Sequence, residues 1–219
     1  MNGLAPADAK GNYRRPPSQH QQATLPAEQE LSKRSADQYP RLIIGRSCPW
    51  AHRTWLVLQL RNLHSSLTLH LARADHKAGR WQLDPAWLGC NSLLALYQRC
   101  GSPPSHRATV PALVDPGTMT SQSPQLLGNE SAQLVEVLNL WPAAKDAPDL
   151  APSHLQGEIN GWQKLLQPAV NDGVYRCGFA RNQAAYDKAC NELFDTLAQV
   201  DRSLSQKGPW LCGDQLTLA

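Results

Sequence analysis

The feature that most constrains the fold of this chain is one cysteine at the junction between a short apolar strand and a helix. The run Leu42-Ile43-Ile44 is apolar, includes two β-branched isoleucines and stops at Gly45, which predicts a buried strand. Pro49 suits the first turn of a helix, where its missing N–H costs nothing, and residues 50–61 continue as an amphipathic helix. This pattern places Cys48 at or beside the helix N-cap.

That position indicates the chemistry of Cys48. The unpaired N–H groups and the positive end of a helix favour a thiolate, so the sequence predicts a nucleophilic thiol. The alternative is an inert buried residue, since free cysteine is among the most buried types. Ala51 stands where a dithiol oxidoreductase has its second cysteine, so any disulfide formed in turnover is expected with a small thiol. His52 and Arg53 add positive charge that either supports the thiolate or belongs to a solvated helix face.

Length and charge restrict the class of protein. At 219 residues the chain suits one large or two small domains. The net charge is only +3 and no Lys/Arg run exceeds two residues, so a nucleic-acid partner is not expected. No segment approaches the ~20 apolar residues of a membrane span, and the N-terminus has no export signal. We therefore expect a soluble cytoplasmic protein without a membrane partner.

The six cysteines, at positions 48, 90, 100, 177, 190 and 212, follow no paired spacing. In a chain of this size that indicates free thiols in a reducing compartment. A zinc site built from Cys90, Cys100 and His106 is conceivable, but no Cys-x2-Cys pair supports it. We expect no metal.

Hydrophobic patterning predicts the first domain. Residues 1–39 are rich in Ala, Pro, Gln, Ser and Arg, which predicts an N-terminal extension that is either flexible or an arm on the surface. Residues 40–140 follow a β-α-β…β-β-α order, which is typical of a thioredoxin-like domain. A long insertion at 73–106 interrupts it and carries Trp81 and Trp87, with a short helix near its end.

The rest of the chain predicts helices. Prolines mark 141–152 as a linker, and 153–219 is expected to be a partial all-α domain with helices at 153–167 and 182–205. Tyr175 is expected in the loop between them. The second helix carries an apolar stripe that we assign to the core: Tyr186, Cys190, Leu193, Phe194, Leu197, Val200 and Leu204.

Five segments, of which the first contains Cys48, stand in a fixed order along the chain: Cys48-Pro49-Trp50-Ala51-His52-Arg53-Thr54, Arg107-Ala108-Thr109-Val110-Pro111-Ala112-Leu113-Val114-Asp115, Gly128-Asn129-Glu130-Ser131, Asn171-Asp172-Gly173-Val174-Tyr175-Arg176-Cys177-Gly178-Phe179-Ala180 and Gly213-Asp214-Gln215-Leu216-Thr217. In that order they resemble the motifs of the glutathionyl-hydroquinone reductases, the Xi class of glutathione transferases. The resemblance runs from about residue 40 to residue 219, with a weaker echo at 11–18.

The resemblance implies a fold. It implies an α/β thioredoxin-like N-terminal domain that binds glutathione, followed by an all-α glutathione-transferase C-terminal domain. Thr217 resembles the N-cap of a helix that is central to the family's all-α domain and continues beyond this point in the family. The resemblance therefore implies a truncated member whose C-terminal domain is incomplete.

The resemblance also implies roles for single residues. Cys48 would be the catalytic nucleophile. The Val110-Pro111 bond is expected to be cis, so that Val110 pairs with the backbone of glutathione. Glu130 would take the ammonium and Ser131 the carboxylate of the γ-glutamyl end. The alternative for that pair is a plain helix cap with a dipole-compensating acid.

Three aromatic residues complete the implied site. Trp81 would line the glutathione site with Trp87 in the core, although the reverse assignment stays open. Trp50 follows the nucleophile and would shield it, and Tyr175 would contact the aromatic substrate.

The activity implied is glutathione-dependent reduction of glutathionyl-hydroquinones through a Cys48–glutathione mixed disulfide. Glutathione would be the co-substrate, quinone-derived small molecules the other partners, and a homodimer stays open. Two alternatives remain: an omega-like thiol transferase or dehydroascorbate reductase with the same nucleophile, and a non-catalytic glutathione-binding module. Trp50 and His52 in the signature favour the first activity.

Overall fold

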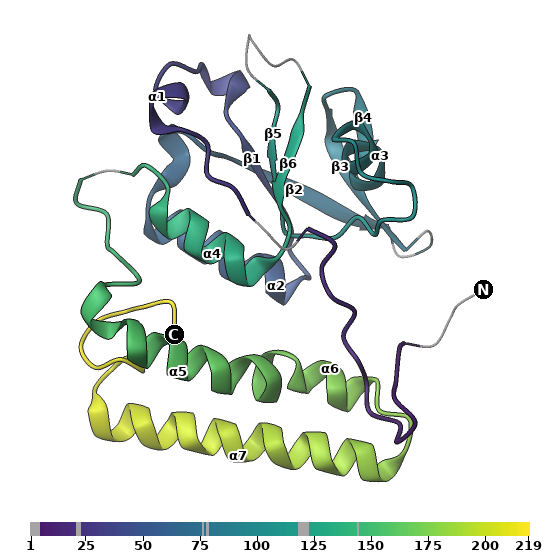
Figure 1. Ribbon diagram of the computed structural model, residues 1–219, viewed down its shortest axis with the longest axis vertical. Coiled ribbons are helices and arrows are strands. Elements are labelled where there is room, and N and C mark those ends of the chain that lie inside the picture. Colours follow the sequence, from purple (N-terminus) through teal and green to yellow (C-terminus); the bar gives the residue numbers. More distant parts are fainter. Residues whose placement is uncertain (1–4, 21–22, 76, 78, 118–122, 144) are drawn as a thin grey trace. The chain divides into compact units, whose positions relative to one another are not determined.

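The computed structural model describes residues 5–20, 23–75, 77, 79–117, 123–143 and 145–219 (Figure 1). They form two compact units: a sheet unit, Ser18–Pro148, and a helical unit, Asp149–Ala219 together with the N-terminal residues up to Pro17. Positions 1–4 and 21–22 of the predicted extension, 76 and 78 of the predicted insertion, and 144 of the predicted linker lie outside the described residues. The domain boundaries expected from the sequence stay a prediction.

The sheet unit has six strands in the order β4-β3-β2-β1-β5-β6. Only β1 and β2 are parallel; the other neighbouring pairs are antiparallel. This mixed sheet confirms the thioredoxin-like prediction. The strands are β1 (Arg41–Gly45), β2 (Thr68–Asp75), β3 (Arg80–Trp87), β4 (Cys90–Ser92), β5 (Ala112–Asp115) and β6 (Gln125–Gly128).

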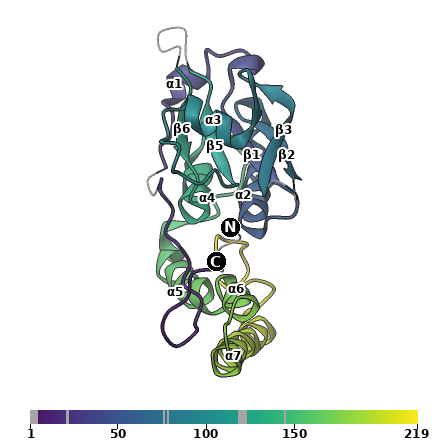
Figure 2. The same cartoon turned by 90° about the vertical axis from the view of Figure 1, so that its right-hand side faces the viewer.

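Strand β1 lies in the middle of the sheet because its residues are apolar on both faces. Leu42, Ile43 and Ile44 are fully buried, as expected for a strand covered on both sides. Helices α2 (Pro49–Leu60) and α4 (Ser131–Leu140) pack side by side (Figures 1 and 2). The short helices of this unit are α1 (Glu28–Leu31), α3 (Leu93–Arg99), η1 (Ala36–Gln38) and η2 (Leu63–Ser65).

The predicted insertion at 73–106 is not a loop. Strands β3 and β4 extend the sheet beyond β2, and α3 packs against them. Leu83 and Trp87 are the buried residues of β3. Pro85 hid this strand in the sequence, because proline is rare inside paired strands. The pairing of β3 with β4 shifts register between Gln82 and Trp87, and such irregularities accommodate a proline.

The helical unit contains α5 (Gln156–Leu166), the π-helix η4 (Gln167–Asn171), α6 (Gly173–Gly178) and α7 (Gln183–Lys207), preceded by the 3-10 turn η3 (Ser153–Leu155). Among the described residues, no helix has both the length and the apolar run needed to cross a bilayer. Among the described N-terminal residues, those up to Pro17 belong to the helical unit and those from Ser18 onward belong to the sheet unit. In the sheet unit, for example, the Thr24 N–H donates to the Leu127 carbonyl over 2.9 Å.

The apolar stripe of α7 is largely a surface, which corrects the core assignment. Of the seven stripe residues only Leu193 is buried, and Phe194 is 62% exposed. The reason is that α7 packs closely on α6 and η4. Such close packing requires mostly small side chains on the face of α7 that is buried. The buried residues of α7 are Ala185, Ala189, Leu193, Thr196 and Ser203. The exposed large apolar ones are Tyr186, Phe194, Leu197 and Leu204.

We expect the 219-residue chain, expressed as printed, to bind a hydrophobic dye, because contiguous exposed apolar surface promotes association. Replacing Phe194 and Leu197 by Glu should remove most of the dye fluorescence and leave the far-UV circular dichroism unchanged. Gln199→Glu and Ser205→Glu, on the same helix, provide a charge-matched control. A double variant that keeps the dye signal of the parent would contradict the assignment of this face.

Candidate functional site

Cys48 occupies the N-cap of α2, as the sequence predicts. A turn after β1 is closed by the Cys48 N–H, which donates to the Gly45 carbonyl over 3.0 Å. Pro49 takes the first helical position. The half-buried thiol donates to the Val110 carbonyl over 3.5 Å. The structure therefore brings the predicted nucleophile to the predicted glutathione-pairing residue.

The segment before β5 is held in place by a buried polar network. The Val110-Pro111 bond is cis, which confirms that prediction. The Tyr97 hydroxyl donates to the Thr109 carbonyl over 2.8 Å and accepts from the Asn129 side-chain amide over 3.1 Å. Burial raises the pKa of Tyr97 to about 12, so the hydroxyl stays a donor at neutral pH. Tyr97 and Asn129 thus fix the backbone that carries Val110.

Glu130 and Ser131 lie where β6 gives way to α4. The helix cap is Glu130, whose carboxylate accepts from the Ala132 N–H over 3.3 Å. Ser131 is the first helical residue and is 2% exposed, so the capping-serine alternative is wrong for Ser131. The acid at the N-terminus also suits the helix dipole. Capping does not exclude a ligand role for Glu130, because a carboxylate accepts several hydrogen bonds.

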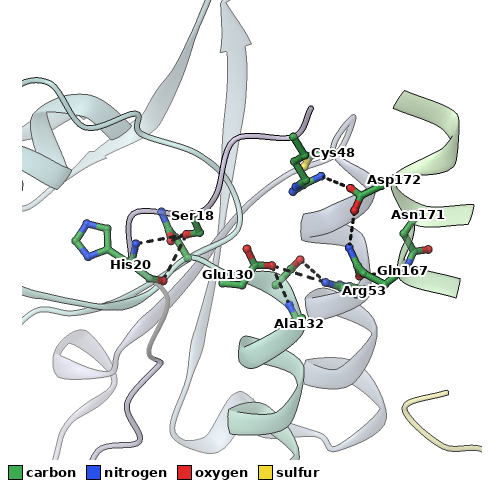
Figure 3. A network of polar contacts seen from close by, with 12 residues as sticks. Ser18, His20, Cys48, Arg53, Glu130, Ala132, Gln167, Asn171 and Asp172 are labelled. Carbon is green, nitrogen blue, oxygen red and sulfur yellow. Dashed lines mark hydrogen bonds and ion pairs between the residues drawn. The ribbon is translucent and has the colours of Figure 1, made fainter. Parts of the chain in front are cut away.

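Arg53 belongs to this site, although the sequence left its role open between supporting the thiolate and lying on a solvated face. Its guanidinium donates to the Ser131 hydroxyl over 2.7 Å and lies 4.0 Å from a Glu130 carboxylate oxygen (Figure 3). It also lies over the Trp50 ring, 5.0 Å from its centroid. Arg53 therefore connects the thiol helix α2 to the beginning of α4. Its position five residues after Cys48, on the next helical turn, was the only signal in the sequence.

Trp50 and the two other tryptophans take different positions. Trp50 is 9% exposed, in the first turn of α2. Trp87 is 7% exposed and packs under the Arg41 guanidinium at 4.5 Å, so it is a core residue. Trp81 is half-buried and its ring covers Gly45 so closely that a side-chain carbon there would overlap it. The glutathione contact of Trp81 stays a prediction.

Tyr175 does not lie in a loop. It belongs to α6, which the sequence did not predict because the helix is short and contains two glycines. Tyr175 is in the helical unit, whereas the other predicted site residues are in the sheet unit. These are Cys48, Trp50, Trp81, Val110, Pro111, Glu130 and Ser131.

Within the described part of the chain, no three His, Cys, Asp or Glu side chains are grouped as they would be around a metal ion. Burial raises the pKa of Cys100 to about 11, with the nearby Cys90 adding to the shift.

Comparisons with known proteins identify relatives of this chain. Residues 47–141 match the model of the glutathione S-transferase N-terminal domain. The chain is 33% identical over 196 residues to the glutathionyl-hydroquinone reductase YqjG of Escherichia coli, covering 84% of this chain and 57% of that protein. It is 31% identical over 224 residues to the omega-like glutathione S-transferase 2 of Schizosaccharomyces pombe, covering 94% and 68%.

A solved structure of a glutathione transferase is also similar to this chain. The glutathione S-transferase Xi of Phanerochaete chrysosporium superposes with a TM-score of 0.80 at 25% identity, over 97% of this chain and 70% of that one. The present chain spans 57% of the length of the Escherichia coli relative. The thioredoxin-like sheet unit, the helical unit that follows it and these similarities show that the chain belongs to the glutathione S-transferase family, with glutathionyl-hydroquinone reductases and Xi-class transferases among its relatives.

Proposed function

We propose that this protein is an enzyme that uses glutathione to reduce glutathionyl-hydroquinones. The observation that carries the proposal is the placement of Cys48 at the N-cap of α2, 3.5 Å from the Val110 carbonyl. A thiol at a helix N-terminus is suited to nucleophilic attack, and the neighbouring backbone can pair with an extended peptide such as glutathione. The names of the relatives support this substrate class.

The reaction proceeds in two exchanges at sulfur. The Cys48 thiolate attacks the glutathione sulfur of the substrate, the carbon–sulfur bond breaks, and the ring carbon takes the bonding electrons and a proton from solvent. This step yields the hydroquinone and a Cys48–glutathione disulfide. A second glutathione thiolate then attacks the glutathione sulfur of that disulfide, which releases oxidised glutathione and regenerates the Cys48 thiolate.

We assign the binding of glutathione to the residues around Cys48. Val110, followed by Pro111, would pair with the glutathione backbone, and Trp81 would cover the peptide beside Gly45. Ser131 and the α4 N-terminus would hold the γ-glutamyl carboxylate, and Glu130 the ammonium. For the aromatic half of the substrate we assign Trp50 and Tyr175. A reducing, cytoplasmic compartment fits the six free cysteines.

Glu130→Ala is expected to weaken glutathione binding and leave the chemical step nearly unchanged, because the γ-glutamyl end is remote from sulfur. Losing a charge-assisted contact should cost about 1.5–3 kcal/mol of binding free energy. Titration calorimetry with glutathione measures this cost directly. Glu136→Ala, at an acidic residue farther along α4, provides the control. An unchanged dissociation constant in Glu130→Ala would leave Glu130 as a helix cap only.

The second candidate is an omega-like thiol transferase or dehydroascorbate reductase, which the omega-like relative supports. Both candidates need Cys48, so substrate preference separates them. We expect faster steady-state turnover of a glutathionyl-hydroquinone than of a glutathionylated peptide or of dehydroascorbate. The opposite ranking favours the second candidate. Glutathione binding without turnover of any of these would identify a non-catalytic binding module.

A further inference from the structure

The helical unit contains a charged cavity of about 400 Å³. One wall comes from the N-terminal arm, residues 5–17, and the others from η4, α6 and α7. All of these segments belong to the helical unit. Among the described residues that line the cavity, the charged side chains are four cations and two acids: Asp8, Arg14, Arg15, Asp172, Arg176 and Lys188. The described lining therefore carries a net charge of +2.

The arm reaches the cavity because it is fastened at the beginning of α7. The Arg181 N–H donates to the Gly11 carbonyl over 3.0 Å, and the Asn182 side-chain amide donates to the Lys10 carbonyl over 3.1 Å. Gly11 has a φ of +81°, and a side-chain carbon there would meet the Asn182 amide at 2.5 Å. Glycine at this position therefore lets the arm lie close enough to the helices to form a wall of the cavity.

Two of the four cations are held in place by neighbouring groups. The Arg176 guanidinium donates to the Pro168 carbonyl over 3.2 Å and to the Glu192 carboxylate over 2.6 Å. The Arg15 guanidinium donates over 3.2 Å to the carboxylate of Asp172, which is 157 residues away in the sequence. A side chain that is already ordered loses less conformational freedom when it binds a ligand. The arm and the helices thus each supply an ordered guanidinium.

The other two cations lie toward solvent. The Arg14 side chain is 74% exposed and lies 3.1 Å from Asp8, and the Lys188 side chain is 64% exposed and lies 3.9 Å from Glu192. Exposed ion pairs of this kind contribute little to stability, because water and salt screen them. Both side chains can therefore turn to an anion in the cavity at a small cost in stability.

We propose that this cavity binds a small polyvalent anion that carries phosphate groups and bridges the arm and the helices of the helical unit. A phosphate group offers several acceptor oxygens, and guanidinium groups bind them through paired, charge-assisted hydrogen bonds. Four cations around one cavity attract a ligand with several negative charges more strongly than a singly charged one. Binding at this site does not require the Cys48 reaction.

Titration calorimetry of the 219-residue chain with pyrophosphate at low ionic strength tests the site. Arg14→Gln should weaken binding about tenfold, the scale of one charge-assisted contact. Arg176→Gln should weaken it at least as much. Arg202→Gln is the matched control, because it makes the same change in net charge on α7 at a position outside the described lining. Asp172→Asn removes a negative charge from the lining while keeping the side-chain shape, so it should bind pyrophosphate severalfold more tightly.

The outcomes distinguish a charge effect from structural damage, because damage to the fold would not tighten binding in Asp172→Asn. The exposed Arg14 keeps the test valid if Arg176→Gln fails to fold by circular dichroism. No binding of pyrophosphate by the wild type, or equal losses in Arg14→Gln and Arg202→Gln, would overturn the site. Succinate, which carries two carboxylates, should bind more weakly than pyrophosphate. Succinate binding as tight as that of pyrophosphate would overturn the assignment of phosphate.

Discussion

Cys48→Ser should abolish reduction of glutathionyl-hydroquinones, with a loss on the order of 10³-fold or more. Serine keeps the size of the side chain but cannot form the mixed disulfide with glutathione on which both exchanges depend. The half-buried position at the α2 N-cap means that the substitution leaves no large cavity, so the fold should survive. Steady-state turnover, with circular dichroism to confirm folding, measures the effect.

The other cysteines provide the control for Cys48. Burial raises the pKa of Cys100 to about 11, and burial together with Cys190 raises the pKa of Cys177, so both thiols stay protonated at neutral pH. Cys100→Ser and Cys177→Ser should therefore keep most of the activity. After incubation with oxidised glutathione, mass spectrometry should find the adduct on Cys48. An adduct on a different cysteine would show that Cys48 is not the nucleophile.

Arg53→Ala should weaken glutathione binding by about 1.5–3 kcal/mol, roughly 10- to 100-fold in Kd. Arg53 donates to the Ser131 oxygen, which leaves the serine hydrogen to point toward a γ-glutamyl carboxylate. The substitution removes that orientation and a positive charge near the carboxylate. Calorimetry with glutathione gives the affinity, and turnover at saturating glutathione should change much less.

The neighbouring residue supplies the comparison for Arg53. His52 is exposed on the same helix and has a ring contact with Trp55 rather than with Glu130 or Ser131. His52→Ala should bind glutathione as the wild type does. If a folded Arg53→Ala protein binds glutathione within about twofold of the wild type, Arg53 is a packing residue between α2 and α4, and the proposed orientation of Ser131 is wrong.

The part of the site that is built from residues adjacent in the sequence could be predicted from local patterns. The strand, the cysteine, the proline and the helix that follows are contiguous, so the Cys48 N-cap could be predicted without tertiary information. Arg53 could not be assigned in this way. Its partner Ser131 is 78 residues away along the chain, and only the packing of α2 against α4 brings the two together.

Periodicity predicts an apolar face but not what covers it. The α7 stripe has the spacing of a core helix, yet α6 and η4 meet the small residues beside it. The prediction missed strand β3 for the opposite reason. Pro85 interrupts the strand pattern in the sequence, but the sheet accommodates the proline through a register shift. In both cases tertiary packing overrode a local rule.

The contact between Gly45 and Trp81 links two positions that are 36 residues apart. A side chain at the last residue of β1 would overlap the Trp81 indole. Conversely, the indole can occupy this position only if the strand ends in glycine. During divergence the two sites should therefore change as a pair. A relative that carries a larger residue at the end of this strand should have replaced or redirected its tryptophan, and an alignment of many members would show the two columns covarying.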